Sequence, residues 1–160
     1  MKLYSFGKFM IVVIILSLTV LSGCSTKDSN LDAVIKQTQN ATSPIASIDR
    51  LEIYHFHGTH QCYSCKTVGA YTEETINTYF ADELRTGKIV FAHVNIDLPE
   101  NKELAAKYGA TGSSLWLGVY DKEGFHKENN VNVWYKINNK WEFTGYLKEI
   151  IDKRLAGDLS

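Results

Sequence analysis

Two cysteines three positions apart, Cys62 and Cys65, lie where a strand pattern gives way to a helical pattern. The stretch LEIYHFH at 51–57 alternates and is rich in β-branched and aromatic residues, which is typical of a β-strand. Apolar residues then recur at helical spacing over 65–84, and this helix is expected to end near Gly87. The arrangement limits the fold more than any other feature, because it puts both thiols at a helix N-terminus beside one end of a sheet.

The rest of the chain continues the alternation of strands and helices. Strand patterns recur at 88–97, 113–120 and 125–129, and helical patterns recur at 99–109 and 143–155. A strand, a crossover helix and a second strand form a parallel pair with a right-handed crossover, while the late hairpin adds an antiparallel edge. The expected fold class is therefore α/β, with the order β-α-β-α-β-β-α and helices flanking a mixed sheet.

The composition fits a single folded domain. The 160 residues are 44% hydrophobic and 12% aromatic, which is sufficient for one packed core. The formal net charge is −1 and the chain has no basic run, so nucleic-acid binding is not expected. No segment provides a flavin or nicotinamide site, no cofactor is expected, and the protein is expected to be a monomer.

The N-terminus carries an export pattern. Lys2 and Lys8 flank the start of an apolar run at 10–21, which is short for a membrane span. The run ends in Leu-Ser-Gly-Cys, with the cysteine at position 24. Small residues before a cysteine resemble the lipobox of bacterial lipoproteins, so Cys24 is expected to be lipidated. The alternative is a plain signal anchor in which Cys24 is incidental.

The export pattern sets the domain organisation and the expected location. We expect a lipoprotein signal peptide at 1–23, the lipidated cysteine and a polar tether at 24–49, and the folded domain at 50–160. The protein would then be a cell-membrane lipoprotein facing the periplasm or the cell exterior. Three cysteines are an odd number, and lipidation of Cys24 leaves the other two as a pair in a compartment that permits disulfides.

The spacing of three short motifs carries a family resemblance. The strand into C-x-x-C is followed by V-N-I-D at 94–97 and by K-Y-G at 107–109, before the third strand. Over residues 50–156 the chain resembles the thioredoxin-like family. More narrowly, F-H-G-T-x-x-C-x-x-C with P-E-N-K resembles a subfamily labelled as a nitrophenyl-compound nitroreductase subunit. The resemblance implies a thioredoxin-like fold and a thiol-disulfide oxidoreductase acting on thiol or disulfide partner proteins.

The chain departs from thioredoxins at three positions. Thioredoxins place a cis-proline just before the third strand, but Ser114 occupies that slot and no proline follows Pro99. A cis bond without proline costs about 3–4 kcal/mol, so Ser114 is expected to follow a trans bond. Thioredoxins also keep a buried aspartate and a lysine near the deeper cysteine, and those slots hold His55 and His93.

The helix N-terminus predicts different roles for the two cysteines. Disulfide exchange requires a thiolate, which free backbone N–H groups and the helix dipole stabilise. Cys62 lies at that end and is the candidate nucleophile, and Cys65, on the same face, is the candidate resolving thiol. By resemblance, His55 and His93 supply a neutral imidazole that accepts the proton of Cys65. The alternatives are a structural disulfide and histidines that only pack and form hydrogen bonds.

Two other functional classes remain open at this stage. His57, His60, Cys62 and Cys65 offer nitrogen and sulfur ligands of the kind that suits zinc or copper, so a metal-binding module is the alternative to a redox enzyme. A redox-inert adaptor that keeps only the fold is the third interpretation.

Overall fold

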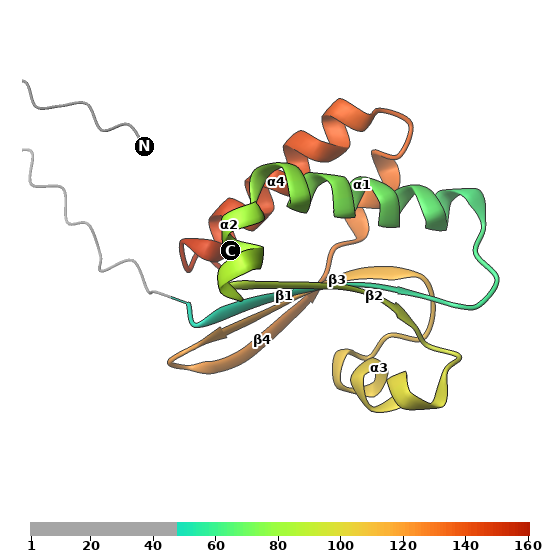
Figure 1. Ribbon diagram of the computed structural model, residues 1–160, viewed down its shortest axis with the longest axis horizontal. Coiled ribbons are helices and arrows are strands. Elements are labelled where there is room, and N and C mark those ends of the chain that lie inside the picture. The colour runs from blue at the N-terminus through green and yellow to red at the C-terminus, as the bar shows by residue number, and fades with distance from the viewer. Residues whose placement is uncertain (1–47) are drawn as a thin grey trace, which may run out of the picture. The chain divides into compact units, whose positions relative to one another are not determined.

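The computed structural model describes residues 48–160 (Figure 1). Within them, no helix is both long enough and apolar enough to cross a membrane. The expectations for the signal peptide, for Cys24 and for most of the tether concern residues outside this range. The elements run in the order β1 Arg50–His57, α1 Tyr63–Tyr79, α2 Ala81–Thr86, β2 Ile89–Asn95, η1 Pro99–Asn101, α3 Lys102–Tyr108, β3 Ser114–Asp121, β4 Gly124–Asn129, η2 Val131–Tyr135 and α4 Lys140–Leu155.

The four strands form one mixed sheet in the order β2-β1-β3-β4. β1 pairs with β2 in parallel, whereas β3 pairs with both β1 and β4 in antiparallel. α1 is the crossover helix between the parallel strands, and a tight turn joins β3 to β4. The sequence-based prediction of an α/β fold with a parallel pair and a late antiparallel edge is confirmed.

The long helix predicted to run to Gly87 is divided at Phe80. Phe80 has φ −133° and ψ 30°, which is not a helical conformation, and its side chain is buried in the core. α2 begins after it and ends at Gly87, whose φ of 76° is a left-handed conformation that suits glycine. Packing of one aromatic side chain therefore breaks a segment whose hydrophobic pattern is continuously helical.

Alternate residues of β1 belong to two separate cores. Leu51 and Ile53 pack with residues of α1 and α4 on one face of the sheet. Tyr54 and Phe56 pack with Tyr108 of α3 on the other face. Figure 1 shows α1 and α4 on one side of the sheet and α3 on the opposite side. This division follows from the period of two in a strand, and it directs the histidines of β1 towards α1.

A buried carboxylate stabilises the face beneath α3. Glu52 accepts hydrogen bonds from the hydroxyls of Tyr108, at 2.7 Å, and Tyr120, at 3.1 Å, and pairs with Arg50 at 2.7 Å. Gly118 lies opposite Glu52 on β3, and a Cβ atom there would overlap the hydroxyl of Tyr108. Burial first, and then the bond to Glu52, raises the pKa of Tyr108. The glycine thus leaves the space that this network needs.

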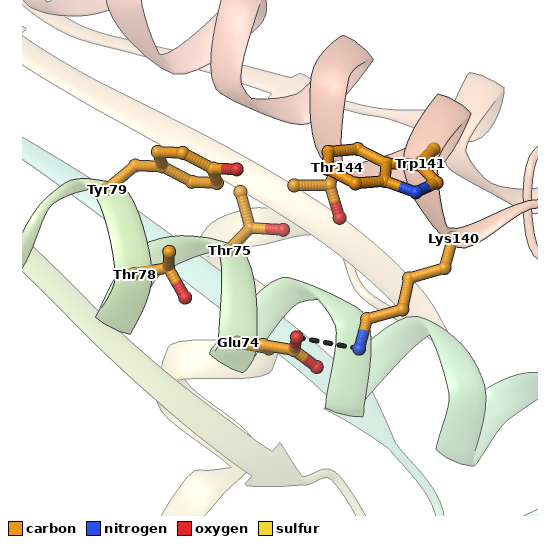
Figure 2. Close-up of a pocket in the computed structure, with 7 residues that line it drawn as sticks. All are labelled: Glu74, Thr75, Thr78, Tyr79, Lys140, Trp141 and Thr144. Atoms are coloured by element: carbon orange, nitrogen blue, oxygen red, sulfur yellow. Dashed lines mark ion pairs between the residues drawn. The ribbon is translucent and has the colours of Figure 1, made fainter.

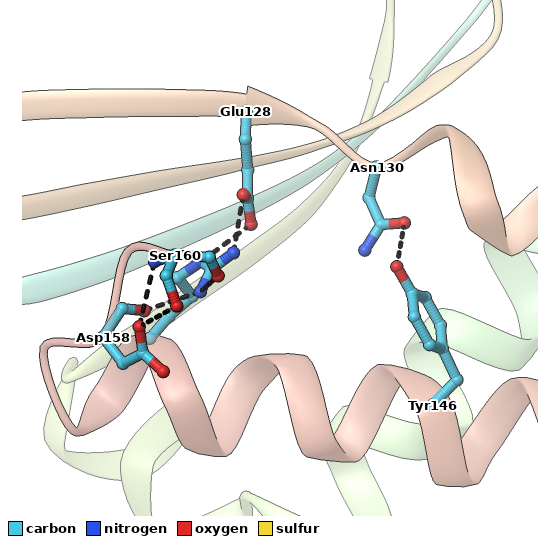
Figure 3. A network of polar contacts seen from close by, with 6 residues as sticks. Glu128, Asn130, Tyr146, Asp158 and Ser160 are labelled. Carbon is cyan, nitrogen blue, oxygen red and sulfur yellow. Dashed lines mark hydrogen bonds and ion pairs between the residues drawn. The ribbon is translucent and has the colours of Figure 1, made fainter.

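The segment 130–141 receives its structure from long-range contacts. The sequence pattern predicts no element there, but η2 forms with Val133 in the main core. Asn130 accepts a hydrogen bond from the hydroxyl of Tyr146 on α4 at 3.0 Å (Figure 3).

Further along α4, Arg154 donates to both carboxylate oxygens of Glu128 on β4, at 2.9 and 2.8 Å. These bonds hold α4 against the sheet.

Candidate active site

The cysteine pair lies at the start of α1, where the sequence pattern places it. Cys62 is exposed and is the N-cap residue of α1, and its sulfur accepts a hydrogen bond from the backbone N–H of Cys65 at 3.3 Å. Cys65 is buried in the first turn of the helix, and both residues are free thiols. One thiol thus faces solvent while its neighbour lies behind it.

The surroundings of Cys65 favour its ionisation. Burial opposes the charged form of Cys65, but contacts with Cys62, with the hydroxyl of Ser113 and with nearby main-chain groups outweigh it, so the pKa of Cys65 lies below its usual value. A thiolate on Cys62 accepts a backbone N–H and lies at the positive end of the helix dipole. Cys62, exposed at the N-cap, is the thiol of the pair that a partner can reach.

Ser113 was not identified from the sequence as a site residue. It belongs to the loop before β3, and the fold brings its hydroxyl to Cys65 from a segment 48 positions later in the chain. Its neighbour Ser114 is buried, donates to the carbonyl of Gly112 and accepts from Trp116 Nε1, both at 3.0 Å. No peptide bond within residues 48–160 is cis, as expected for Ser114.

His55 and His93 form a hydrogen-bonded pair of imidazoles. They are register partners on the parallel strands β1 and β2, and their Nδ1 atoms are 3.0 Å apart. The rings are nearly perpendicular, and their centroids are 5.2 Å apart. At these two distances both nitrogens lie close to the line between the ring centres, which is the geometry of a hydrogen bond. One proton therefore lies between the two imidazoles.

Gly69 allows this pair to pack beneath α1. A Cβ atom at Gly69 would lie 2.7 Å from Nδ1 of His55, closer than real contacts allow, and 3.1 Å from Cε1 of His93, which is unusually tight. Gly69 is one helical turn beyond Cys65, so the glycine brings the imidazoles against the turn that carries the deeper thiol. An isolated glycine inside a helical pattern is a signal of such close packing that the sequence does contain.

His55 is a neutral base at physiological pH. Its ring is 1% exposed, and Nε2 has no hydrogen-bond partner within the described residues. Burial first, and then positive charge on His93 and His57, lowers the pKa of His55 to about 4, although the neighbouring main chain of Cys65 acts in the opposite direction. A neutral imidazole with a free lone pair is able to accept a proton.

Two residues of the V-N-I-D motif hold the loop that leads to Cys62. Asp97 accepts a hydrogen bond from the backbone N–H of Thr59 at 2.7 Å, and Asn95 donates from Nδ2 to the hydroxyl of Thr59 at 3.1 Å. The bond from the Thr59 backbone is the main reason that the pKa of Asp97 is lowered. The motif therefore positions the approach to the cysteine pair.

The residues offered for zinc or copper do not assemble into a ligand set. Over residues 48–160, no three histidine, cysteine, aspartate or glutamate side chains converge in a way that would hold a metal ion. His57 donates from Nδ1 to the carbonyl of Gly58 at 2.9 Å, and His60 is exposed on the loop. The arrangement of His57, His60, Cys62 and Cys65 therefore gives no support to the metal interpretation.

A hollow of about 260 Å³ lies between α1 and α4 (Figure 2). Its wall contains the ion pair of Glu74 and Lys140, 2.6 Å apart, and the 82%-exposed side chain of Trp141. Glu74 is more than three turns along α1 from Cys62, about 18 Å at the helical rise. This hollow is separate from the cysteine pair.

Comparison with known proteins finds only distant structural likenesses. No model of a protein family matches the chain, and no curated protein matches it either. A thioredoxin of Fasciola hepatica is 22% identical over 57% of this chain and 81% of its own, with a TM-score of 0.34. A structure described as a malarial protein is 14% identical over 51% of this chain and 82% of its own, with a TM-score of 0.35.

Likenesses as distant as these carry no argument, and the fold is established from the structure itself. The strand order, the parallel β1–β2 pair, the antiparallel hairpin and the helices on both faces are observed directly. With the cysteine pair at the start of α1, this topology is thioredoxin-like, as the sequence predicts. The fold is shown, and the roles of the individual site residues stay predictions.

Proposed function

We propose that the protein is a thiol-disulfide oxidoreductase that exchanges disulfides with partner proteins through Cys62 and Cys65. One observation best supports this. The exposed thiol of Cys62 lies at a helix N-terminus, with the buried thiol of Cys65 behind it and the buried, neutral imidazole of His55 next to the turn that carries Cys65. A structural disulfide needs no such base. Tyr63, 79% exposed next to Cys62, supplies apolar surface for contact with a partner.

The proposed exchange runs in two steps. The Cys62 thiolate attacks a partner disulfide, forms a mixed disulfide, and one partner sulfur leaves as a thiolate. Cys65 then loses its proton to His55 and attacks the sulfur of Cys62. A bond forms between the two cysteines, the bond to the partner breaks, and its electron pair leaves with the second partner sulfur. The partner is reduced by two electrons and the protein is oxidised by two, and the reverse sequence oxidises a partner dithiol.

Redox titration of the full chain carrying Cys24→Ser, in which the pair provides the only thiols, tests this proposal. We expect the dithiol fraction to follow a two-electron curve in glutathione buffers, with a midpoint above about −300 mV. A structural disulfide would stay oxidised throughout that range, and a redox-inert adaptor would show no exchange with a protein disulfide. Either result would contradict the proposed activity.

We further propose that the domain is tethered to a membrane through lipid on Cys24, facing the periplasm or the cell exterior. The support is the short apolar run followed by Leu-Ser-Gly-Cys. Expressed in a host with the lipoprotein pathway, the protein should fractionate with membranes and incorporate labelled fatty acid. The Cys24→Ala protein should lose the label, and retention of label would contradict lipidation at this residue.

The narrower resemblance to a nitrophenyl-compound nitroreductase subunit adds no further activity to this proposal. It rests on F-H-G-T-x-x-C-x-x-C, which runs from the end of β1 into the first turn of α1, and on P-E-N-K, which spans η1 and the first residue of α3. The proposed activity at these positions is dithiol exchange.

A further inference from the structure

We propose that Glu73 is a positioning residue that sets the tautomers of His93 and His55, so that the buried Nε2 of His55 is bare and able to accept the proton of Cys65. The inference rests on the proposed dithiol exchange and extends it by a path for the proton. Glu73 lies on α1 two turns beyond Cys65, and its Oε2 is 3.4 Å from Nε2 of His93.

The carboxylate decides which nitrogen of His93 carries hydrogen. An ionised glutamate only accepts hydrogen bonds, so Nε2 of His93 is the protonated nitrogen in the contact with Glu73. A neutral imidazole has one N–H, which leaves a lone pair on Nδ1 of His93. Within residues 48–160, His55 and Glu73 are the only side chains that form hydrogen bonds with His93.

The same reasoning fixes the tautomer of His55. Because Nδ1 of His93 has the lone pair, Nδ1 of His55 carries the hydrogen of the 3.0 Å bond between them. Nε2 of His55 is then bare. This is the buried ring nitrogen that has no hydrogen-bond partner within residues 48–160, and its ring packs against α1 at Gly69, one turn beyond Cys65. A bare nitrogen is the form that accepts the thiol proton.

The bonds form a path from the interior to solvent. When Cys65 attacks, its proton passes to Nε2 of His55, the Nδ1 proton of His55 passes to Nδ1 of His93, and the Nε2 proton of His93 passes to Glu73 or water. The side chains of His93 and Glu73 are 37% and 54% exposed. When a partner dithiol supplies the two electrons that reduce the Cys62–Cys65 disulfide, Cys65 takes up one proton by the reverse steps and both tautomers are restored.

The path opens into a hollow of about 310 Å³ beside the cysteine pair. His57 of β1 and Lys66 of α1 are the other titratable side chains in its lining. His57 is already bonded to the carbonyl of Gly58.

Two substitutions at position 73 separate this role from a structural one. Glu73→Ala removes the acceptor, whereas Glu73→Lys supplies only donors and should reverse both tautomers, placing hydrogen on Nε2 of His55. Glu74 is an ideal control because it is adjacent on α1, equally exposed and paired with Lys140 instead. Glu74→Ala and Glu74→Lys therefore make the same changes of charge without touching the histidines.

The measurements are nitrogen-15 NMR of the imidazoles and single-turnover resolution of a mixed disulfide on Cys62, in the full chain with Cys24→Ser. We expect the parent to show hydrogen on Nε2 of His93 and Nδ1 of His55. Resolution should slow about three- to tenfold in Glu73→Ala, the range for one lost hydrogen bond, and at least tenfold in Glu73→Lys. The Glu74 variants should keep both the parental tautomers and the parental rate.

The outcomes distinguish this inference from the function it extends. Parental tautomers and rates in both Glu73 variants, with exchange intact, would overturn the role of Glu73 and leave the oxidoreductase proposal standing. Hydrogen on Nδ1 of His93 and on Nε2 of His55 in the parent protein would also overturn the role of Glu73. NMR observes these tautomers directly, so this outcome does not depend on whether the protein is active. A parent that exchanges no disulfide would overturn the proposed function, and the proton path with it.

Discussion

Cys62→Ser should abolish turnover in a disulfide-reduction assay, whereas Cys65→Ser should accumulate mixed disulfides with the partner. Cys62 is the exposed thiol at the N-cap of α1, so its replacement removes the attacking atom. Cys65 is the buried thiol that completes the reaction, and its loss leaves the attack intact but the intermediate unresolved. Non-reducing gels and mass spectrometry of the trapped species measure the difference.

Cys24→Ser serves as the control for this pair of substitutions, because it also replaces a thiol by a hydroxyl but lies outside the folded domain expected at 50–160. Its rate in solution should equal that of the parent. Equal turnover by the Cys62→Ser protein would show that the pair does not carry the reaction. If the Cys62→Ser protein, and not the Cys65→Ser protein, accumulated the mixed disulfide, the roles assigned to the two cysteines would be reversed.

His55→Phe and His93→Leu should each slow resolution at pH 7 by about a hundredfold, the usual contribution of a positioned base, while sparing the first attack. The reason is that His55 is the neutral base beside Cys65 and His93 holds the other end of its ring, 3.0 Å away. Stopped-flow release of partner from a preformed Cys62 mixed disulfide isolates this step. His126→Leu, on β4 and bonded to Asp121, is the matched control.

The pH profile offers a second measurement of the same base. The lowered pKa of His55, about 4, keeps the imidazole neutral well below pH 6.5, so its assistance should persist into mild acid and fade only as the pH approaches 4. A histidine without this burial would lose its assistance near pH 6.5. Parental resolution in both histidine variants would show instead that these residues only pack, and unchanged thermal unfolding would exclude damage to the fold.

Local pattern in the sequence was enough for the order of elements and for the position of the cysteine pair. Alternation along 51–57 places the histidines on the opposite face from Tyr54 and Phe56, because successive side chains of a strand point to opposite faces of the sheet. Gly87 and Gly109 marked helix ends, since both adopt the left-handed conformation. These features depend on neighbours a few residues away, and so the sequence alone records them.

The details of the site depended on contacts between distant segments. His55 meets His93 because the register of two parallel strands aligns residues 38 positions apart. Ser113 reaches Cys65 through the loop before β3, and Glu73 reaches His93 only after α1 has crossed over the sheet. Hydrophobic periodicity states which face of an element is buried, but not which side chains meet there. Strand register and helix docking decide that, and they are settled only when the whole core packs.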